Sequence, residues 1–172
     1  IRLRRIAQRF SVTIGLIAGL VSGAASARAA DSADAPSSCK FEPETNCAFA
    51  KLEGADLAGR DLTDSMFHGA VLKGANLRGA QLERVDLQVS SLAGADLRDA
   101  NLENAHLFAI DGRGARFGKA NLRGVNFLDA KLQGADLTGA DVTGARFLQA
   151  NLSGATWPDG RHCAEGSIGE CR

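Results

Sequence analysis

The sequence lacks most of the features on which metal sites and common enzymes depend. It has three histidines and no C-x-x-C pair, which leaves little support for a metal site. The motifs G-x-S-x-G and H-E-x-x-H, the P-loop and a pair of catalytic carboxylates are all missing. The glycines of GRGARFG at residues 112–118 do not have the G-x-G-x-x-G spacing. We therefore expect no enzymatic activity, no cofactor or metal, and no small-molecule substrate.

The chain also lacks an excess of positive charge. Its 172 residues hold 20 basic and 20 acidic side chains, and five of the arginines belong to the segment 1–30. Without that segment, 20 − 5 = 15 basic side chains face 20 acidic ones, a net charge of −5. A mildly negative protein has no basic footprint for nucleic acid, so we expect no nucleic-acid partner.

Residues 1–30 have the order of a secretory signal peptide. Four arginines precede an apolar run from Phe10 to about Ala25, and Ala27-Arg28-Ala29 matches the small-residue cleavage pattern. The alternative is a membrane anchor, but the run falls short of the roughly 20 apolar residues that a spanning helix needs. We predict cleavage near Ala29 or Ala30, export to the periplasm or the outside of a bacterium, and no membrane span after cleavage.

Four cysteines flank the central part of the chain as two pairs, Cys39 with Cys47 and Cys163 with Cys171. An even number of cysteines in an exported chain indicates disulfides. Four cysteines allow three connectivities, and their number does not choose among them.

The central part is a repeat of five residues. Counting in fives from Leu52 to Trp157 gives 22 positions without an insertion: fifteen Leu, four Phe, one Val, one Trp and one Gly. Two residues before each of them, Ala fills 16 of the 22 sites. A short fixed period of this kind outranks local propensity as evidence of fold. The aromatic members are expected to plug the core: Phe67, Phe117, Phe127, Phe147 and Trp157.

The odd period determines the course of the backbone. In an extended chain alternate side chains share a side, so the small residue and the large one two positions later can both point inward. A turn must then reset the phase, and the glycine common two residues after the large one tolerates the positive φ that such a turn needs. One corner per five residues winds the chain into a coil. The spacing of three and four residues that an amphipathic helix requires is absent.

Segments such as ANLRG, ADLTG and ANLSG resemble the pentapeptide-repeat family, whose pattern is A-[DN]-L-x-x. The resemblance covers about residues 50–157. It implies an all-β fold, a right-handed quadrilateral β-helix with four repeats per coil. On that fold the chain makes 22/4 = 5.5 coils, a rod of about 26 Å at ~4.8 Å per layer.

The tail WPDGRHCAEGSIGEC also resembles the closing segment of secreted members of this family. We divide the chain into a signal peptide (1–30), an N-terminal cap (31–49), the β-helix (50–157) and a C-terminal cap (158–172). Trp157 would be the lid of the core, and the two cysteine pairs would staple the two ends. On a rod of this length the ends are too far apart for a disulfide, so the resemblance favours Cys39–Cys47 and Cys163–Cys171, unless a terminal arm folds back.

With four repeats per coil, residues 20 apart stack in columns. Gly112 then replaces one Leu in a column of core residues, and Ile110 at the neighbouring small-residue site is expected to fill part of the lost volume. The segment NAHLFAIDGRGARF at 104–117 therefore keeps the five-residue count and is no inserted loop. One outward column carries Asp96, Arg116 and Asp136, which we interpret as a ladder of solvated charges. Another carries His106, and a single histidine gives little support for catalysis.

One outward column contains Phe108, Leu128 and Leu148 as adjacent apolar residues. Contiguous exposed apolar surface often marks an interaction site, so these three residues form a predicted interaction strip. The alternative is that the C-terminal tail folds over them.

These features predict an exported, non-enzymatic solenoid that binds another protein or associates with itself. The family resemblance also suggests a DNA mimic that acts on DNA gyrase. That role needs a surface with a large excess of negative charge, whereas residues 51–161 hold 14 acidic and 13 basic side chains.

Overall fold

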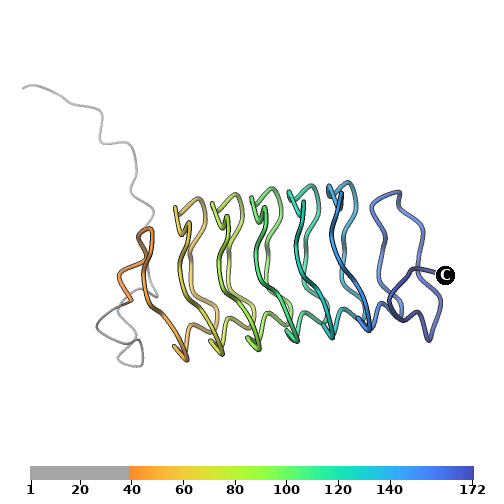
Figure 1. Ribbon diagram of the computed structural model, residues 1–172, viewed down its shortest axis with the longest axis horizontal. Helices are drawn as coiled ribbons and strands as arrows, with labels where there is room; N and C mark the ends of the chain where they lie inside the picture. Colours follow the sequence, from red (N-terminus) through yellow and green to blue (C-terminus); the bar gives the residue numbers. More distant parts are fainter. Residues whose placement is uncertain (1–38) are drawn as a thin grey trace, which may run out of the picture.

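The computed structural model describes residues 39–172. The predicted signal peptide and residues 31–38 of the predicted N-terminal cap lie outside the described residues. The described chain forms a rod of stacked coils, with its N-terminal residues at one end and the C-terminus at the other (Figure 1).

Neighbouring coils are joined by parallel β-bridges between residues 20 positions apart, from Asn46↔Met66 to Asp136↔Thr156. The 20-residue step confirms that the columns deduced from the repeat are real. Residues 39–172 contain no continuous strand and no helix, because a two-residue turn follows each bridge. The β structure is thus a series of isolated bridges. The expected all-β chain is present as these bridges and not as continuous strands.

The turns adopt the conformation that the repeat predicted. From Gly54 to Gly154, the residue two positions after each core residue has a positive φ, for example 66° at Gly94 and 61° at Asp99. Glycine favours this conformation but is not required for it. The corner is therefore imposed by the stacking of the coils as well as by the local sequence.

Both inward positions of the repeat are buried along nearly the whole rod. Three of the expected aromatic plugs are fully buried, Phe147 is nearly so, and Trp157 is partly exposed at the end. The ring of Phe147 stacks on Phe127 at a centroid distance of 5.0 Å and meets Trp157 at 5.1 Å. Besides Trp157, the repeat positions that are not buried are Arg60, Val142 and Ala145.

Gly112 lies in a filled core. A Cβ atom built on Gly112 would come within 3.0 Å of Leu132 Cδ2 and 3.2 Å of Ile110 Cδ1. Ile110 is fully buried. The two larger side chains occupy the volume that a Leu would take, which confirms the compensation expected from the sequence.

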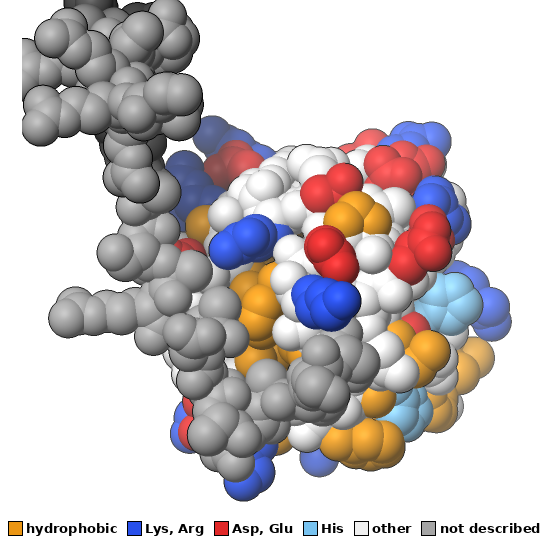
Figure 2. Space-filling view, turned by 90° about the vertical axis from the view of Figure 1, so that its left-hand side faces the viewer, with side chains coloured by type: hydrophobic (Ala, Val, Ile, Leu, Met, Phe, Trp, Pro, Cys, Tyr) orange, Lys and Arg blue, Asp and Glu red, His pale blue; other side chains and the backbone are white. Residues whose placement is uncertain are grey.

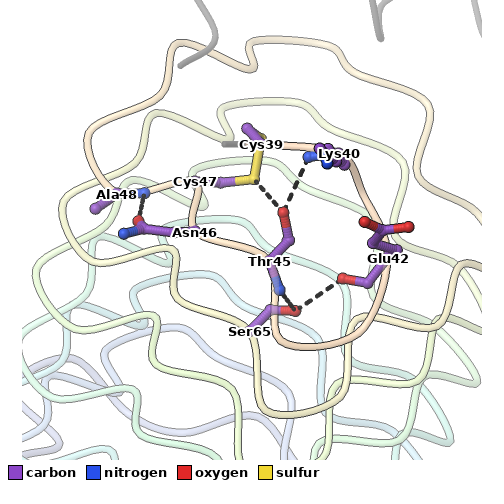
Figure 3. Close-up of a disulfide and its surroundings, with 8 residues drawn as sticks. All are labelled: Cys39, Lys40, Glu42, Thr45, Asn46, Cys47, Ala48 and Ser65. Carbon is purple, nitrogen blue, oxygen red and sulfur yellow. Dashed lines mark hydrogen bonds between the residues drawn. A yellow bond between two sulfur atoms is a disulfide. The ribbon is translucent and has the colours of Figure 1, made fainter. Parts of the chain in front are cut away.

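The N-terminal cap is closed by the Cys39–Cys47 disulfide, whose Cα atoms lie 4.6 Å apart. Figure 3 shows Thr45 beside it: the Thr45 N–H donates to Ser65 Oγ at 3.2 Å, and its Oγ1 accepts the Lys40 N–H at 2.9 Å. The Glu44 N–H donates to the Thr63 carbonyl at 2.9 Å, as the equivalent groups do in the coils that follow. The repeat register therefore extends further toward the N-terminus than counting from Leu52 indicated, with fully buried Cys47 in a core position.

The C-terminal tail leaves the repeat register. It turns at Gly160 and forms antiparallel bridges, Thr156↔His162 and Asn151↔Ile168. The Cys163–Cys171 disulfide closes it, with Cα atoms 4.7 Å apart. Both predicted pairings are thus confirmed. The tail stacks on the end of the last coil, where Gly169 lies against the backbone of residues 147–149 and its N–H donates to the Ala150 carbonyl at 2.9 Å. It leaves the Leu148 side chain 61% exposed.

Candidate interaction face

One of the four sides of the rod carries most of the exposed hydrophobic surface. This side, here called the apolar face, consists of residues 46–50, 66–70, 86–90, 106–110, 126–130 and 146–150. Among residues 39–172, the large hydrophobic side chains that are exposed lie on it or in the adjoining cap: Phe49, Met66, Val89, Leu148 and Ile168. Viewed along the rod, hydrophobic and histidine side chains gather at the lower right, while acidic and basic side chains gather above them (Figure 2).

The three residues of the predicted strip lie in successive layers of the apolar face. Phe108 and Leu128 are half-buried, and Leu148 has 61% of its surface exposed. The Ala109 N–H donates to the Leu128 carbonyl at 2.9 Å, and the Asp129 N–H donates to the Leu148 carbonyl at 3.1 Å. The backbone under the strip is therefore fixed by coil-to-coil hydrogen bonds.

The structure adds two residues that the sequence pattern did not identify, Phe49 and Val89. They are 72% and 57% exposed and lie at the corner beside the strip. The Val89 N–H donates to the Phe108 carbonyl at 3.0 Å, so Val89 continues the strip toward the N-terminus. Both residues stand where the repeat usually has Gly, and this substitution was the signal that could have identified them.

Phe49 and Val89 have backbone conformations that their side chains disfavour. Their φ angles are 58° and 59°, in the left-handed region. A bulky or β-branched residue is an outlier there, and such strain costs on the order of 1–3 kcal/mol per residue. Strained positions of this kind cluster at binding and active sites. Exposed non-glycine residues such as Asp64 and Lys119 have a positive φ at other corners too, so this corner is distinguished by the large hydrophobic side chains that it exposes.

Phe49 is held by its neighbours in the next coil. Its ring meets the His68 ring edge-on at a centroid distance of 5.7 Å. A Cβ atom on Gly69 would lie 2.7 Å from the Phe49 ring carbons Cδ1 and Cε1. Only glycine at this position leaves room for the ring, because real Cβ atoms do not approach other atoms so closely.

His68 and His106 lie on the apolar face, each beside residues of neighbouring coils. His68 Nδ1 lies 4.0 Å from Asp86 Oδ2, and His106 bridges to Asp86 and Asn126 in the neighbouring coils. No group of three or more histidine, cysteine or acidic side chains that could hold a metal ion occurs in residues 39–172. In the same part of the chain, no helix is long and apolar enough to cross a membrane.

The charge ladder lies on another side of the rod. Arg98 donates to both carboxylate oxygens of Asp96, at 2.7 and 2.5 Å, and Arg116 lies 3.5 Å from the same carboxylate. The hydrogen bonds from Arg98 lower the pKa of Asp96 to about 2, with a smaller contribution from the charge of Arg116. The hydrogen bonds from the Thr138 side chain and backbone lower the pKa of Asp136 as well.

A shallow hollow on the same side is lined by Arg78, Arg98, Asp99, Gly118, Lys119 and Thr138. It exists because Gly118 has no side chain between Arg98 and Thr138. Arg78 is paired with Asp99 at 3.2 Å, and Arg98 is paired with Asp96. These pairs neutralise the two arginines, so the apolar face remains the stronger candidate for a functional surface.

Comparison with known proteins identifies the repeat. The family model described as "Pentapeptide repeats (8 copies)" matches residues 50–88, and the model "Pentapeptide repeat region" matches residues 80–157. Neither model describes an enzyme. No curated protein matches the chain.

Several solved structures are similar to this chain. A pentapeptide repeat protein from Nostoc PCC 7120 is 36% identical, with 53% of this chain and 67% of that chain covered and a TM-score of 0.37. HetL from Nostoc sp. strain PCC 7120, described as involved in heterocyst differentiation regulation, is 28% identical over 69% and 77% of the two chains, with a TM-score of 0.38. QnrB1, a plasmid-mediated fluoroquinolone resistance protein, is 18% identical over 70% and 75%, with a TM-score of 0.38. The repeat, the buried core and the family models together establish that the chain belongs to the pentapeptide-repeat family.

Proposed function

We propose that this protein is an exported, non-enzymatic scaffold that binds a protein partner through its apolar face. In this proposal the chain is a right-handed quadrilateral β-helix of about five and a half coils. The observation that carries the proposal is the gathering of exposed hydrophobic side chains on one side of the rod. Contiguous apolar surface on a soluble protein often marks an interaction site.

Rigidity supports a binding role for this face. Coil-to-coil hydrogen bonds fix the backbone of each strip residue, and the strained corners at Phe49 and Val89 hold large side chains outward. A surface that is ordered before it meets its partner loses less conformational entropy on binding. The expected partner is another protein or a second copy of the chain.

Export to the periplasm or beyond is part of the same proposal. It rests on the order of residues 1–30 and is consistent with two disulfides, which persist in oxidising compartments. Cell fractionation followed by mass mapping of the mature N-terminus tests it. We expect a chain that begins near Asp31 in the exported fraction, whereas an uncleaved chain in the cytoplasm would contradict export.

The alternative of a DNA mimic acting on gyrase receives no support from the repeat surface. A phosphate mimic needs a dense excess of negative charge. On the rod, acidic side chains such as Asp96, Asp64 and Asp141 are paired with arginines instead. A paired carboxylate presents little net charge to a partner.

Replacing Phe108 or Leu128 by Asp tests the binding role. Each change places a charge in the middle of the apolar face, and we expect at least tenfold weaker association, because a desolvated carboxylate opposes an apolar contact. Crosslinking in the native compartment with partners identified by mass, and sedimentation of the purified protein, measure the effect. Ala58→Asp, at the equivalent exposed position on another side of the rod, is the matched control. Unchanged crosslinks and sedimentation in both folded variants would rule the apolar face out.

A further inference from the structure

The apolar face has two outward positions in each layer. One comes just before the buried core residue and the other just after it, as His106 and Phe108 do on either side of buried Leu107. The positions after the core residue contain the interaction strip. The positions before it, here called the polar column, read Asn46, Met66, Asp86, His106, Asn126 and Arg146. These residues are joined by bridges 20 positions apart, so their order in the sequence is also their order along the rod.

The polar column carries one carboxylate and one guanidinium, three layers apart. Asp86 is half-buried, its Oδ1 accepts the Gln88 N–H at 3.0 Å, and its Oδ2 lies 4.0 Å from His68 Nδ1. Arg146 is exposed and forms no ion pair within residues 39–172. The apolar face therefore presents an arginine without a carboxylate and a carboxylate without an arginine.

A two-fold axis that crosses the rod midway between Phe108 and Leu128 brings opposite charges and apolar side chains together. Two apolar faces packed about this axis run in opposite directions. With 20 residues per layer, Phe108 lies opposite Leu128 of the second copy, and Asp86 lies opposite Arg146. A two-fold interface is isologous, so each of these contacts occurs twice.

The outer layers of the overlap also match. Gln88 lies opposite Leu148 of the second copy, with the exposed corner residue Val89 beside it. His106 lies opposite Asn126 in the polar column. The strip of one copy thus faces the strip of the other, and the two polar columns face each other beside it.

Other alignments match less well. With the axis through the layer of Leu128, Phe108 would lie opposite Leu148, but Arg146 would lie opposite His106 and Asp86 would lie beyond the last coil. With the two rods parallel, each strip would face the polar column of the other copy. The antiparallel alignment about the midpoint between Phe108 and Leu128 satisfies both the apolar and the charged side chains.

We propose that the apolar face binds a second copy of the chain, in an antiparallel dimer with its two-fold axis midway between Phe108 and Leu128. This inference rests on the proposed binding role of the face and identifies its partner. The overlap covers the four layers from 86–90 to 146–150, about 19 Å at ~4.8 Å per layer. An overlap of this length is at the small end of specific interfaces, so we expect the dimer to dissociate on dilution. The charged pairs fix the register and direction, which is the usual contribution of complementary charges.

Exchange of the two charges tests the register. Sedimentation equilibrium of the full chain with both disulfides intact should show a monomer–dimer equilibrium. Arg146→Glu or Asp86→Arg brings like charges together twice per dimer and should raise the dimer Kd about tenfold or more. The double variant restores opposite charges and should regain the original Kd. Lys73→Glu, which reverses an exposed charge on another side of the rod, is the matched control and should leave the Kd unchanged.

Crosslinking tests the direction of the two rods. Gln88→Cys and Leu148→Cys are prepared separately and treated with a short bis-maleimide, alone and as a mixture. In the antiparallel dimer the two cysteines of one variant lie three layers apart, about 14 Å along the rod at ~4.8 Å per layer. We therefore expect efficient crosslinking only in the mixture. A parallel dimer would crosslink within each variant alone.

The proposal is overturned if the chain sediments as a monomer at all concentrations, if the double charge variant does not recover, or if crosslinks form within the separate cysteine variants. A monomeric chain that loses its crosslinks to another protein in Phe108→Asp would overturn the dimer and leave the binding role of the apolar face intact. The crosslinking needs neither charge variant, so it decides the question even where Asp86→Arg does not fold.

Discussion

At the N-terminal end, residues 44–49 follow the register of the solenoid, whereas at the C-terminal end residues 160–172 leave it. The N-terminal cap pairs in parallel with the first coil, through Glu44 N–H to Thr63 O and the Asn46↔Met66 bridge. The C-terminal cap pairs antiparallel with residues 150–157. Both caps are closed by a disulfide between cysteines eight positions apart.

The two caps cover the exposed end coils of the solenoid in different ways. A cap that keeps the register completes hydrogen bonds of the coil it covers, but it places the non-glycine corner residues Glu44 and Phe49 at φ angles of 60° and 58°. A cap that reverses uses glycines at its corners, such as Gly160 and Gly166, and avoids that strain. As a consequence, no following coil within residues 39–172 accepts the N–H groups of Val142 and Gly144.

Truncating an aromatic plug near each end should give the largest effects. Phe67→Ala removes a fully buried ring between complete coils, and we expect a loss of about 4–5 kcal/mol in the free energy of unfolding. Phe147→Ala lies in the last coil beside partly exposed Val142 and Ala145, where the cavity is more easily filled, and should cost about 3 kcal/mol. Urea titration followed by circular dichroism measures both. Equal losses would contradict the view that the C-terminal end is less completely covered.

Removing each disulfide should have an intermediate effect. Closing a loop of this length contributes about 2–3 kcal/mol, so Cys163→Ala with Cys171→Ala should lower the free energy of unfolding by that amount. Cys39→Ala with Cys47→Ala should cost about 1 kcal/mol more, because Cys47 also fills a core position. Trp157, the single tryptophan, lies at the C-terminal end and reports on that end by fluorescence.

In the C-terminal double variant the Trp157 signal should therefore change at lower urea than the circular dichroism signal. In the N-terminal variant it should not. The opposite pattern would mean that the two disulfides do not act on their own ends.

Exchanging the corner residues should give the smallest effects, of opposite sign at the two ends. Glu44→Gly removes a non-glycine side chain from a left-handed backbone conformation and should stabilise the protein by up to about 1 kcal/mol. Gly160→Ala places a side chain in such a conformation and should destabilise the protein by about 1 kcal/mol. Thermal unfolding measures both. Gly94→Ala, at a corner with open space around it, gives the cost of the conformation alone. Two changes of the same sign would show that corner strain does not separate the caps.

The five-residue count predicted most of the core because burial along the rod follows the position of a residue in the repeat, except at Arg60 and near the C-terminal end. The columns, the corners and the role of Ile110 beside Gly112 follow from that count. The N-terminal extent of the repeat did not, because Cys47 and Thr45 stand where the pattern has Leu and Ala. The antiparallel tail could not be deduced either, since its pairing has no counterpart in the repeat.

The candidate surface was only partly predictable for a related reason. Phe108, Leu128 and Leu148 are visible as a column of apolar residues at an outward position. Phe49 and Val89 were missed because their position belongs to the turn, where glycine was expected. Whether a side chain at a corner points into solvent depends on the left-handed backbone, which the coil imposes and the sequence pattern does not display.

The bridges between successive coils also govern how the chain folds. Leu92 N–H reaches the Asp111 carbonyl and Asp111 N–H reaches the Ser90 carbonyl, so each bond of this kind joins one coil only to the next, wherever it occurs along the rod. The loop that must close is thus of constant size and does not grow with the number of coils. Each coil can pair during synthesis as soon as the following coil has emerged, and neither disulfide reaches across more than its own cap. An insertion equal in length to one whole coil would lengthen such a rod without disturbing the alignment of its columns.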